Sequence, residues 1–187
     1  MSRPKNDKKE GYISDWDKKS KSSDKVFVYL TAIDLEWIDK NVKRIVEHNK
    51  KVGKVDKKHD VNQSSYDAHY LGMMGEYAVS KHLGCELPNV ELLTGGDNGI
   101  DLTIGRYQIQ VKTTKMANPA LIFDDIDDFK TNVALLAKRV SPVCVWLVGI
   151  TGRSNFLLHW HEHDYGYGNR MVLYKKYLSS VDMLREQ

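Results

Sequence analysis

The chain has 187 residues, a net charge of +3 and 41% hydrophobic residues, values that are typical of a globular protein with a substantial core and exclude a largely disordered chain. The longest apolar run, Val143 to Ile150, is far too short to cross a bilayer, and the charged N-terminus does not resemble a secretory signal. Cys85 and Cys144 lack the spacing of metal ligands, so we expect two reduced thiols in a cytoplasmic protein without membrane contact.

Charge is distributed unevenly along the chain. The first 58 residues carry 16 Lys or Arg against 10 Asp or Glu, whereas the remainder carries 12 against 15. A basic arm on a mildly acidic body favours contact with a phosphate backbone, although a solvated lysine-rich tail is an ordinary alternative. We expect residues 1–24 to be a disordered basic tail and residues 25–187 to form a single domain.

The ordered part is predicted to begin with a strand at Val26 to Leu30 and a helix capped by Thr31 or Asp34. Apolar residues follow at helical spacing: Leu35, Ile38, Val42, Ile45 and Val46. Residues 50–63 read as an exposed basic linker, which either follows a nucleic-acid strand or is a solvated loop. Residues 25–64 would then be an N-terminal extension of the core at 65–165.

A second helix is predicted from Tyr66 to Leu83, with Gly84 as its stop signal. Gly72 and Gly75 would allow this helix to approach a sheet closely. Glu76 lies at the edge of the apolar stripe, which comprises Ala68, Leu71, Met74, Gly75, Ala78, Val79 and Leu83. A surface glutamate is the ordinary interpretation, yet a carboxylate at this rim can reach Asp101 if the helix packs on the next hairpin.

That hairpin is predicted from alternating residues on both sides of Gly105-Arg106, a two-residue turn signal. The register places Ile104 opposite Tyr107, Leu102 opposite Ile109 and Ile100 opposite Val111. The other face carries Asp101 opposite Gln110, with Lys112 diagonal to both. Two acceptor oxygens and an ammonium can bind a hard cation and place a positive charge beside a phosphate, which is the chemistry of a metal-dependent phosphodiesterase. Asp97, in the glycine-rich entry, is a spare acid that more simply serves the turn.

Two segments after the hairpin contain clustered side chains that could bind a metal, and each has a more ordinary structural interpretation. Ala120 to Phe123 suggests a strand, and the acidic Asp124 to Asp128 reads as the N-terminal charge of a helix over 129–140 rather than as a metal site. Val143 to Ile150 is typical of a central strand, and Gly152 marks a turn to a strand at Asn155 to His163.

The histidines 159, 161 and 163 invite a zinc interpretation, but a polar edge-strand face is favoured because no fourth ligand has a familiar spacing. The tyrosines at 165, 167, 174 and 177, near Lys175 and Lys176, could stack on bases. The favoured interpretation is a C-terminal helix over 166–187 that docks on the body through Leu173, Tyr177, Leu178, Val181 and Leu184.

Three segments, in this order, resemble the PD-(D/E)XK nuclease superfamily, whose core runs from a helix with Glu through a strand with Asp to a strand with Glu-X-Lys. The segments are Gly75-Glu76-Tyr77-Ala78, Gly99-Ile100-Asp101-Leu102 and Gln110-Val111-Lys112. Gln110 stands where Glu is commonest, a variant similar to that of VRR-NUC-type members. The flanks are similar to uncharacterised phage and prokaryotic proteins of the superfamily, and the resemblance covers about residues 65–165.

The resemblance implies an α/β restriction-endonuclease-like fold, with a mixed central sheet flanked by helices and an N-terminal helical extension. It implies that Glu76 and Asp101 hold Mg²⁺ or Mn²⁺ with the Gln110 side-chain oxygen and the Val111 carbonyl, while Lys112 orients or helps deprotonate the attacking water. The substrate would be nucleic acid, DNA before RNA, in a bacterial or phage-infected cytoplasm, and a homodimer stays open. The alternative is an inactive nucleic-acid- or partner-binding protein, such as a phage accessory factor. A small-molecule enzyme is disfavoured, since the chain lacks a glycine-rich phosphate loop and a serine elbow.

Overall fold

The computed structural model describes residues 25–53, 64–90, 99–166 and 168–185. Its strands are β1 (Val26–Tyr29), β2 (Leu102–Ile104), β3 (Tyr107–Thr114), β4 (Ala120–Phe123), β5 (Val133–Ser141), β6 (Cys144–Gly152), β7 (His161–Asp164) and β8 (Asn169–Tyr174). Its helices are α1 (Ala32–Lys51), α2 (Ser65–Leu83) and α3 (Arg153–His159), with short 3-10 helices η2 (Ile126–Asp128), η3 (Lys175–Tyr177) and η4 (Val181–Leu184). The predicted α/β class is confirmed.

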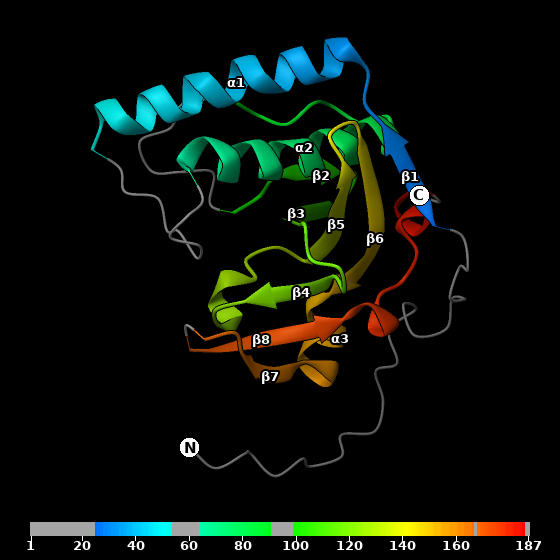
Figure 1. Ribbon diagram of the computed structural model, residues 1–187. Helices are drawn as coiled ribbons and strands as arrows, with labels where there is room; N and C mark the ends of the chain where they lie inside the picture. Colours follow the sequence, from blue (N-terminus) through cyan, green and yellow to red (C-terminus); the bar gives the residue numbers. More distant parts are fainter. Residues whose placement is uncertain (1–24, 54–63, 91–98, 167, 186–187) are drawn as a thin grey trace.

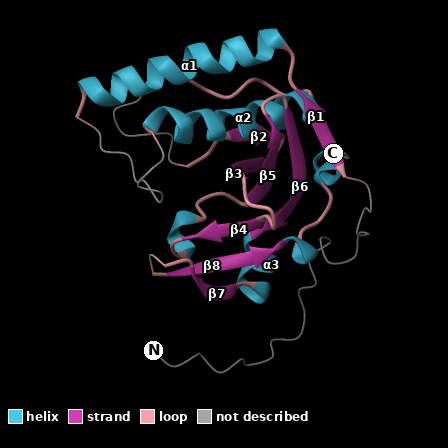
Figure 2. Ribbon diagram, viewed as in Figure 1, coloured by secondary structure: helices cyan, strands magenta, loops and turns pink. Residues whose placement is uncertain are grey.

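The strands form two sheets. The larger is five-stranded in the order β1-β6-β5-β3-β2, and the smaller is three-stranded in the order β4-β8-β7 (Figure 1). The larger sheet is mixed, because β3 and β5 run parallel while its other neighbours are antiparallel. Figure 2 shows helix α2 between α1 and the larger sheet, with the smaller sheet at the other end of the molecule.

Local sequence signals account for both long helices. Thr31 accepts a hydrogen bond from the Asp34 backbone N–H, and the Asp34 carboxylate accepts one from the Thr31 backbone N–H, which completes a capping box at the start of α1. Helix α2 ends where Gly84 adopts the left-handed conformation, with φ of 67°. The predicted strand at the N-terminus and both predicted helices are therefore confirmed.

Strand β5 joins the two layers of the core. Val133, Leu135 and Ala137 belong to the cluster that α2 covers, while Ala134 and Leu136 belong to a second cluster under the smaller sheet. Phenylalanine rings fill the second cluster in stacked and edge-on contacts, and these rings are Phe123, Phe129 and Phe156. Because β5 is covered on both faces, its side chains from Val133 to Ala137 are all buried.

The predicted helix over 129–140 is wrong, since most of this segment is β5. Apolar residues at 129, 133, 136 and 140 match a helical period by chance, because a strand buried on both faces gives a continuous apolar run without period two. The acidic residues before it cap only a short turn: the Asp125 carboxylate accepts hydrogen bonds from the backbone N–H groups of Asp127 and Asp128. The central strand predicted at Val143 to Ile150 is confirmed as β6, between β1 and β5.

The predicted C-terminal helix over 166–187 is also wrong within the described residues. Strand β8 is followed by η3 and η4, although Leu173, Val181 and Leu184 are buried as expected. The predicted strand from Asn155 to His163 begins instead as helix α3, and only His161–Asp164 is extended. The predicted disordered tail at 1–24, most of the predicted basic linker at 50–63 and Asp97 lie outside the described residues. Where the chain is described, none of its helices combines the length and apolar character needed to span a membrane.

Candidate functional site

The β2–β3 hairpin has the register that its turn predicts. Leu102 pairs with Ile109, Thr103 with Gln108 and Ile104 with Tyr107, around Gly105 in the left-handed conformation. Strand β2 begins only at Leu102, so Asp101 precedes the regular ladder. The hairpin thus brings Asp101 beside the segment that carries Gln110, Val111 and Lys112.

Asp101 is fixed to β3 by two hydrogen bonds. Its backbone N–H donates to the Ile109 carbonyl at 3.0 Å, and its Oδ2 accepts from the Val111 backbone N–H at 2.6 Å. Since backbone N–H groups of a sheet point along the sheet plane, this bond holds the carboxylate near that plane, at the edge where β2 begins. One carboxylate oxygen is committed to β3, and the group is half-buried.

Gln110 is buried, with 8% of its surface exposed. Its side-chain oxygen Oε1 has no hydrogen-bond partner among the described residues. Leaving a buried acceptor unpaired costs about 1–3 kcal/mol. A buried oxygen of this kind can bind a cation or a water molecule, so Gln110 Oε1 fits the predicted role of metal ligand.

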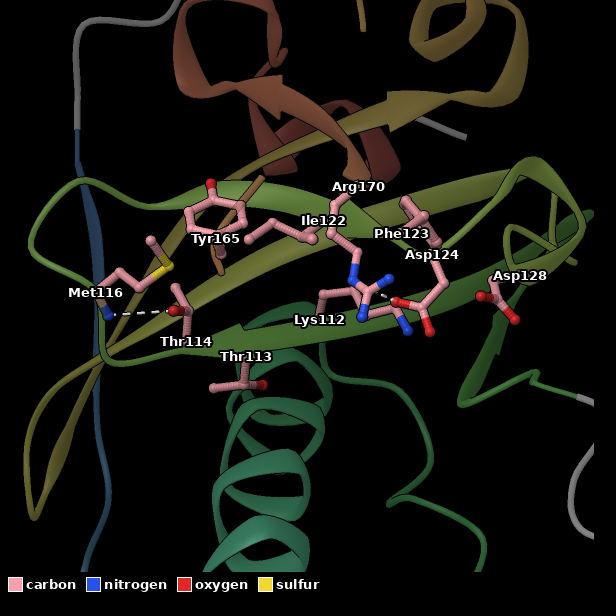
Figure 3. A pocket seen from close by; sticks show the side chains of 10 residues that line it. All are labelled: Lys112, Thr113, Thr114, Met116, Ile122, Phe123, Asp124, Asp128, Tyr165 and Arg170. Atoms are coloured by element: carbon pink, nitrogen blue, oxygen red, sulfur yellow. Dashed lines mark hydrogen bonds and ion pairs between the residues drawn. The ribbon is translucent and has the colours of Figure 1, made fainter. Parts of the chain in front are cut away.

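Lys112 points to the side of β3 opposite to α2. Its ammonium nitrogen lies 5.1 Å from the centre of the Phe123 ring of β4, an attractive cation–π arrangement. Figure 3 shows Lys112 above β3 and the neighbouring Thr113 turned down toward α2. No ion pair or hydrogen bond engages the Lys112 ammonium within the described residues, so its charge is available to a ligand.

Glu76 lies on α2, which packs against the other face of β3. A Cβ atom added at Gly75 would lie 1.9 Å from Thr113 Oγ1, which shows how closely the helix and strand approach. Glu76 Oε1 is near Gly72, one turn earlier, 3.7 Å from a Cβ added there. The close approach that the two glycines predict is therefore confirmed at Gly75. Glu76 therefore lies on the helix that covers one face of β3, and Lys112 projects from the opposite face. Asp101 lies at the sheet edge where β2 begins.

The donor set is low in charge. Across residues 25–53, 64–90, 99–166 and 168–185, no three side chains of His, Cys, Asp or Glu gather into a metal-binding group. A metal at the hairpin would therefore depend on Asp101, Glu76 and neutral oxygens such as that of Gln110.

His161 and His163 lie on an edge strand, as predicted, whereas His159 is the last residue of helix α3. Strand β7 is an edge strand of the smaller sheet, and its side chains are exposed. His163 contacts the ring of Tyr165 and His161 contacts those of Tyr174 and Tyr177. The sequence does not predict these ring contacts, because they depend on how α3 and the turn into β8 bring the residues together. Both cysteines are free thiols.

The structure adds a cavity that the sequence did not predict. It has a volume of about 550 Å³ and opens between β3 and the smaller sheet. Its lining residues are Lys112, Thr113, Thr114, Met116, Ile122, Phe123, Asp124, Asp128, Tyr165 and Arg170. Comparison of the chain with protein-family models, with curated proteins and with solved structures finds no match.

Proposed function

We propose that the chain is a Mg²⁺- or Mn²⁺-dependent nuclease with a restriction-endonuclease-like core, and that its partner is nucleic acid, DNA first, in the cytoplasm. The observation that carries the proposal is the buried Oε1 of Gln110, which has no partner among the described residues, on the same hairpin as a carboxylate fixed by a hydrogen bond. The order of α2, β2 and β3 supports the same interpretation, with Glu76 on α2, Asp101 directly before β2 and Lys112 on β3.

The residues would divide the work by charge. Asp101, Gln110, the Val111 carbonyl and Glu76 would hold the cation, which when bound supplies Lewis-acid polarisation of the phosphate and of water. The hydrogen bond from Val111 keeps Asp101 in one orientation before the metal arrives. Lys112, with its charge unpaired within the described chain, would orient the attacking water and stabilise the charge that develops on the phosphate.

Cleavage assays with the full chain test the proposal. Labelled single-stranded and double-stranded DNA and RNA are incubated with Mg²⁺, Mn²⁺ or EDTA. We expect metal-dependent cleavage that Asp101→Asn and Lys112→Ala abolish, while Asp127→Asn, which alters an exposed carboxylate on η2, leaves it unchanged.

The inactive binding protein is the alternative that this assay separates. The neutral Gln110 and the low number of carboxylates favour that alternative. Nucleic-acid binding without cleavage under any metal, unchanged in Gln110→Glu, would reject the nuclease and support a protein that acts by occupying its partner.

A further inference from the structure

The cavity between β3 and the smaller sheet is unequal at its two ends. Figure 3 shows Met116 and Tyr165 at one end and Asp128 at the other, with Lys112, Asp124 and Arg170 between them. Its volume of about 550 Å³ lies within the range of pockets that enclose small organic ligands. A ligand with a planar apolar part toward Met116 and Tyr165 and an anionic part toward Lys112 matches this arrangement.

The charges in the cavity are partly compensated. Arg170 Nε and Asp124 Oδ1 form an ion pair at 3.0 Å, which neutralises one carboxylate within the wall. Lys112 and Asp128 make no side-chain ion pair within the described residues. Among the described residues, the wall therefore offers the Lys112 ammonium for a single phosphate and the Asp128 carboxylate as an acceptor for a hydroxyl or amino group.

Tyr165 supplies a flat apolar surface at one end of the cavity. Its ring contacts that of His163 edge-on, with centroids 4.4 Å apart. Burial raises the pKa of Tyr165, so its hydroxyl stays neutral at ordinary pH. Aromatic rings of this kind bind unpaired bases by stacking, in a way that tolerates any sequence.

We propose that this cavity takes one unpaired nucleotide, with its base against Tyr165 and its phosphate at Lys112. The inference rests on the proposed nuclease function and adds its substrate class, because a base can enter this cavity only when it is unpaired, as in a single strand, at a frayed end or after extrusion from a duplex. Lys112 borders both the cavity and the hairpin, so the phosphate of the captured nucleotide is the one presented to Asp101 and Gln110.

Binding measured in EDTA tests the inference without any cleavage. The probe is a short fluorescein-labelled oligothymidylate, and its match is the same sugar–phosphate strand with abasic sites throughout. We expect wild type to bind the base-bearing strand about tenfold more tightly by anisotropy, as one stacked base would provide. Tyr165→Leu should lose this preference and Tyr165→Phe should keep it, while Tyr29→Leu, which alters an exposed ring on β1 in the larger sheet, should behave as wild type.

The outcomes distinguish the two proposals. Equal affinity of wild type for the base-bearing and abasic strands would overturn the cavity assignment even if DNA is cleaved. A preference that depends on Tyr165 in a protein that cleaves nothing would keep the cavity and reject the nuclease. The wild-type comparison needs no variant, so it decides the question even if Tyr165→Leu does not fold.

Discussion

Gly75 of α2 and Thr113 of β3 are in contact without room for a methyl group between them. A Cβ at Gly75 would lie 1.9 Å from Thr113 Oγ1 and 3.0 Å from Thr113 Cβ. We expect Gly75→Ala to lower the free energy of unfolding by about 1–3 kcal/mol, because overpacking forces backbone shifts. Urea denaturation measures this change. Gly72→Ala is the matched control, because its nearest neighbour is Glu76 Oε1 at 3.7 Å, and the better helix propensity of alanine should leave stability equal or higher.

The same contact predicts partial rescue in a double variant. Thr113→Ala removes the hydroxyl and methyl groups that a residue at position 75 would meet, and Thr113 Oγ1 has no hydrogen-bond partner within the described chain. Gly75→Ala should therefore cost less stability in the Thr113→Ala background. Additive effects of the two changes would show that the helix and strand do not meet as described.

Asp34 predicts how stability depends on acid. Burial raises its pKa, but hydrogen bonds from Lys81, Thr31 and Tyr77 outweigh burial and lower the pKa to about 2 from 3.8. Because the folded pKa is lower than the unfolded one, the contribution is complete above pH of about 4 and is lost as the pH falls toward 2. The lost stability is about 2 kcal/mol. Asp34→Asn should reduce the slope of the free energy of unfolding against pH between about pH 4 and pH 2. A slope equal to that of wild type would show that Asp34 is not the group responsible.

Replacing Gln110 with an apolar residue should raise the stability of the metal-free protein and remove its metal binding. In EDTA we expect Gln110→Leu to raise the free energy of unfolding by about 1 kcal/mol, since it removes a buried acceptor that has no partner among the described residues. Adding Mn²⁺ should stabilise wild type but not this variant, as thermal unfolding would show. Gln110→Glu is the matched change that keeps the ligand oxygen, and it should bind Mn²⁺ at least as tightly as wild type. Destabilisation by Gln110→Leu in EDTA would mean that the amide is satisfied within the protein.

Asp101 should serve the fold and the metal through different oxygens. Asparagine can still accept the Val111 hydrogen bond but carries no charge. Asp101→Asn should thus keep a stability close to that of wild type in EDTA and lose Mn²⁺ binding in calorimetry. Equal Mn²⁺ binding by the two proteins would reject the proposed metal site.

The sequence predicts best those elements whose signals are local. Thr31 with Asp34, Gly84, and the turn at Gly105 each specify a boundary through residues a few positions away, and all three are found. The sequence predicts a helix where strand β5 is found, because β5 is buried on both faces and its apolar run therefore lacks the alternation of a strand. This burial depends on how the two sheets pack, which no local signal specifies.

The candidate site was predictable to a similar extent. The register that brings Asp101 beside Gln110 and Val111 follows from a two-residue turn. The separation of Glu76 and Lys112 onto opposite faces of β3 follows from how α2 and the smaller sheet pack. The cavity could not be predicted, because Tyr165 and Arg170 meet β3 only through the pairing of β4 with β8.

The two walls of the cavity differ in how far they can yield. Strand β3 is bonded to β2 and β5 along its edges, and at Thr113 it already touches α2, so it has no space to retreat. The facing wall belongs to a sheet whose outer strand, β7, borders solvent. An oversized occupant would therefore push the smaller sheet outward and leave Asp101, Gln110 and Lys112 in register, so tolerance for different bases need not disturb the geometry of the hairpin.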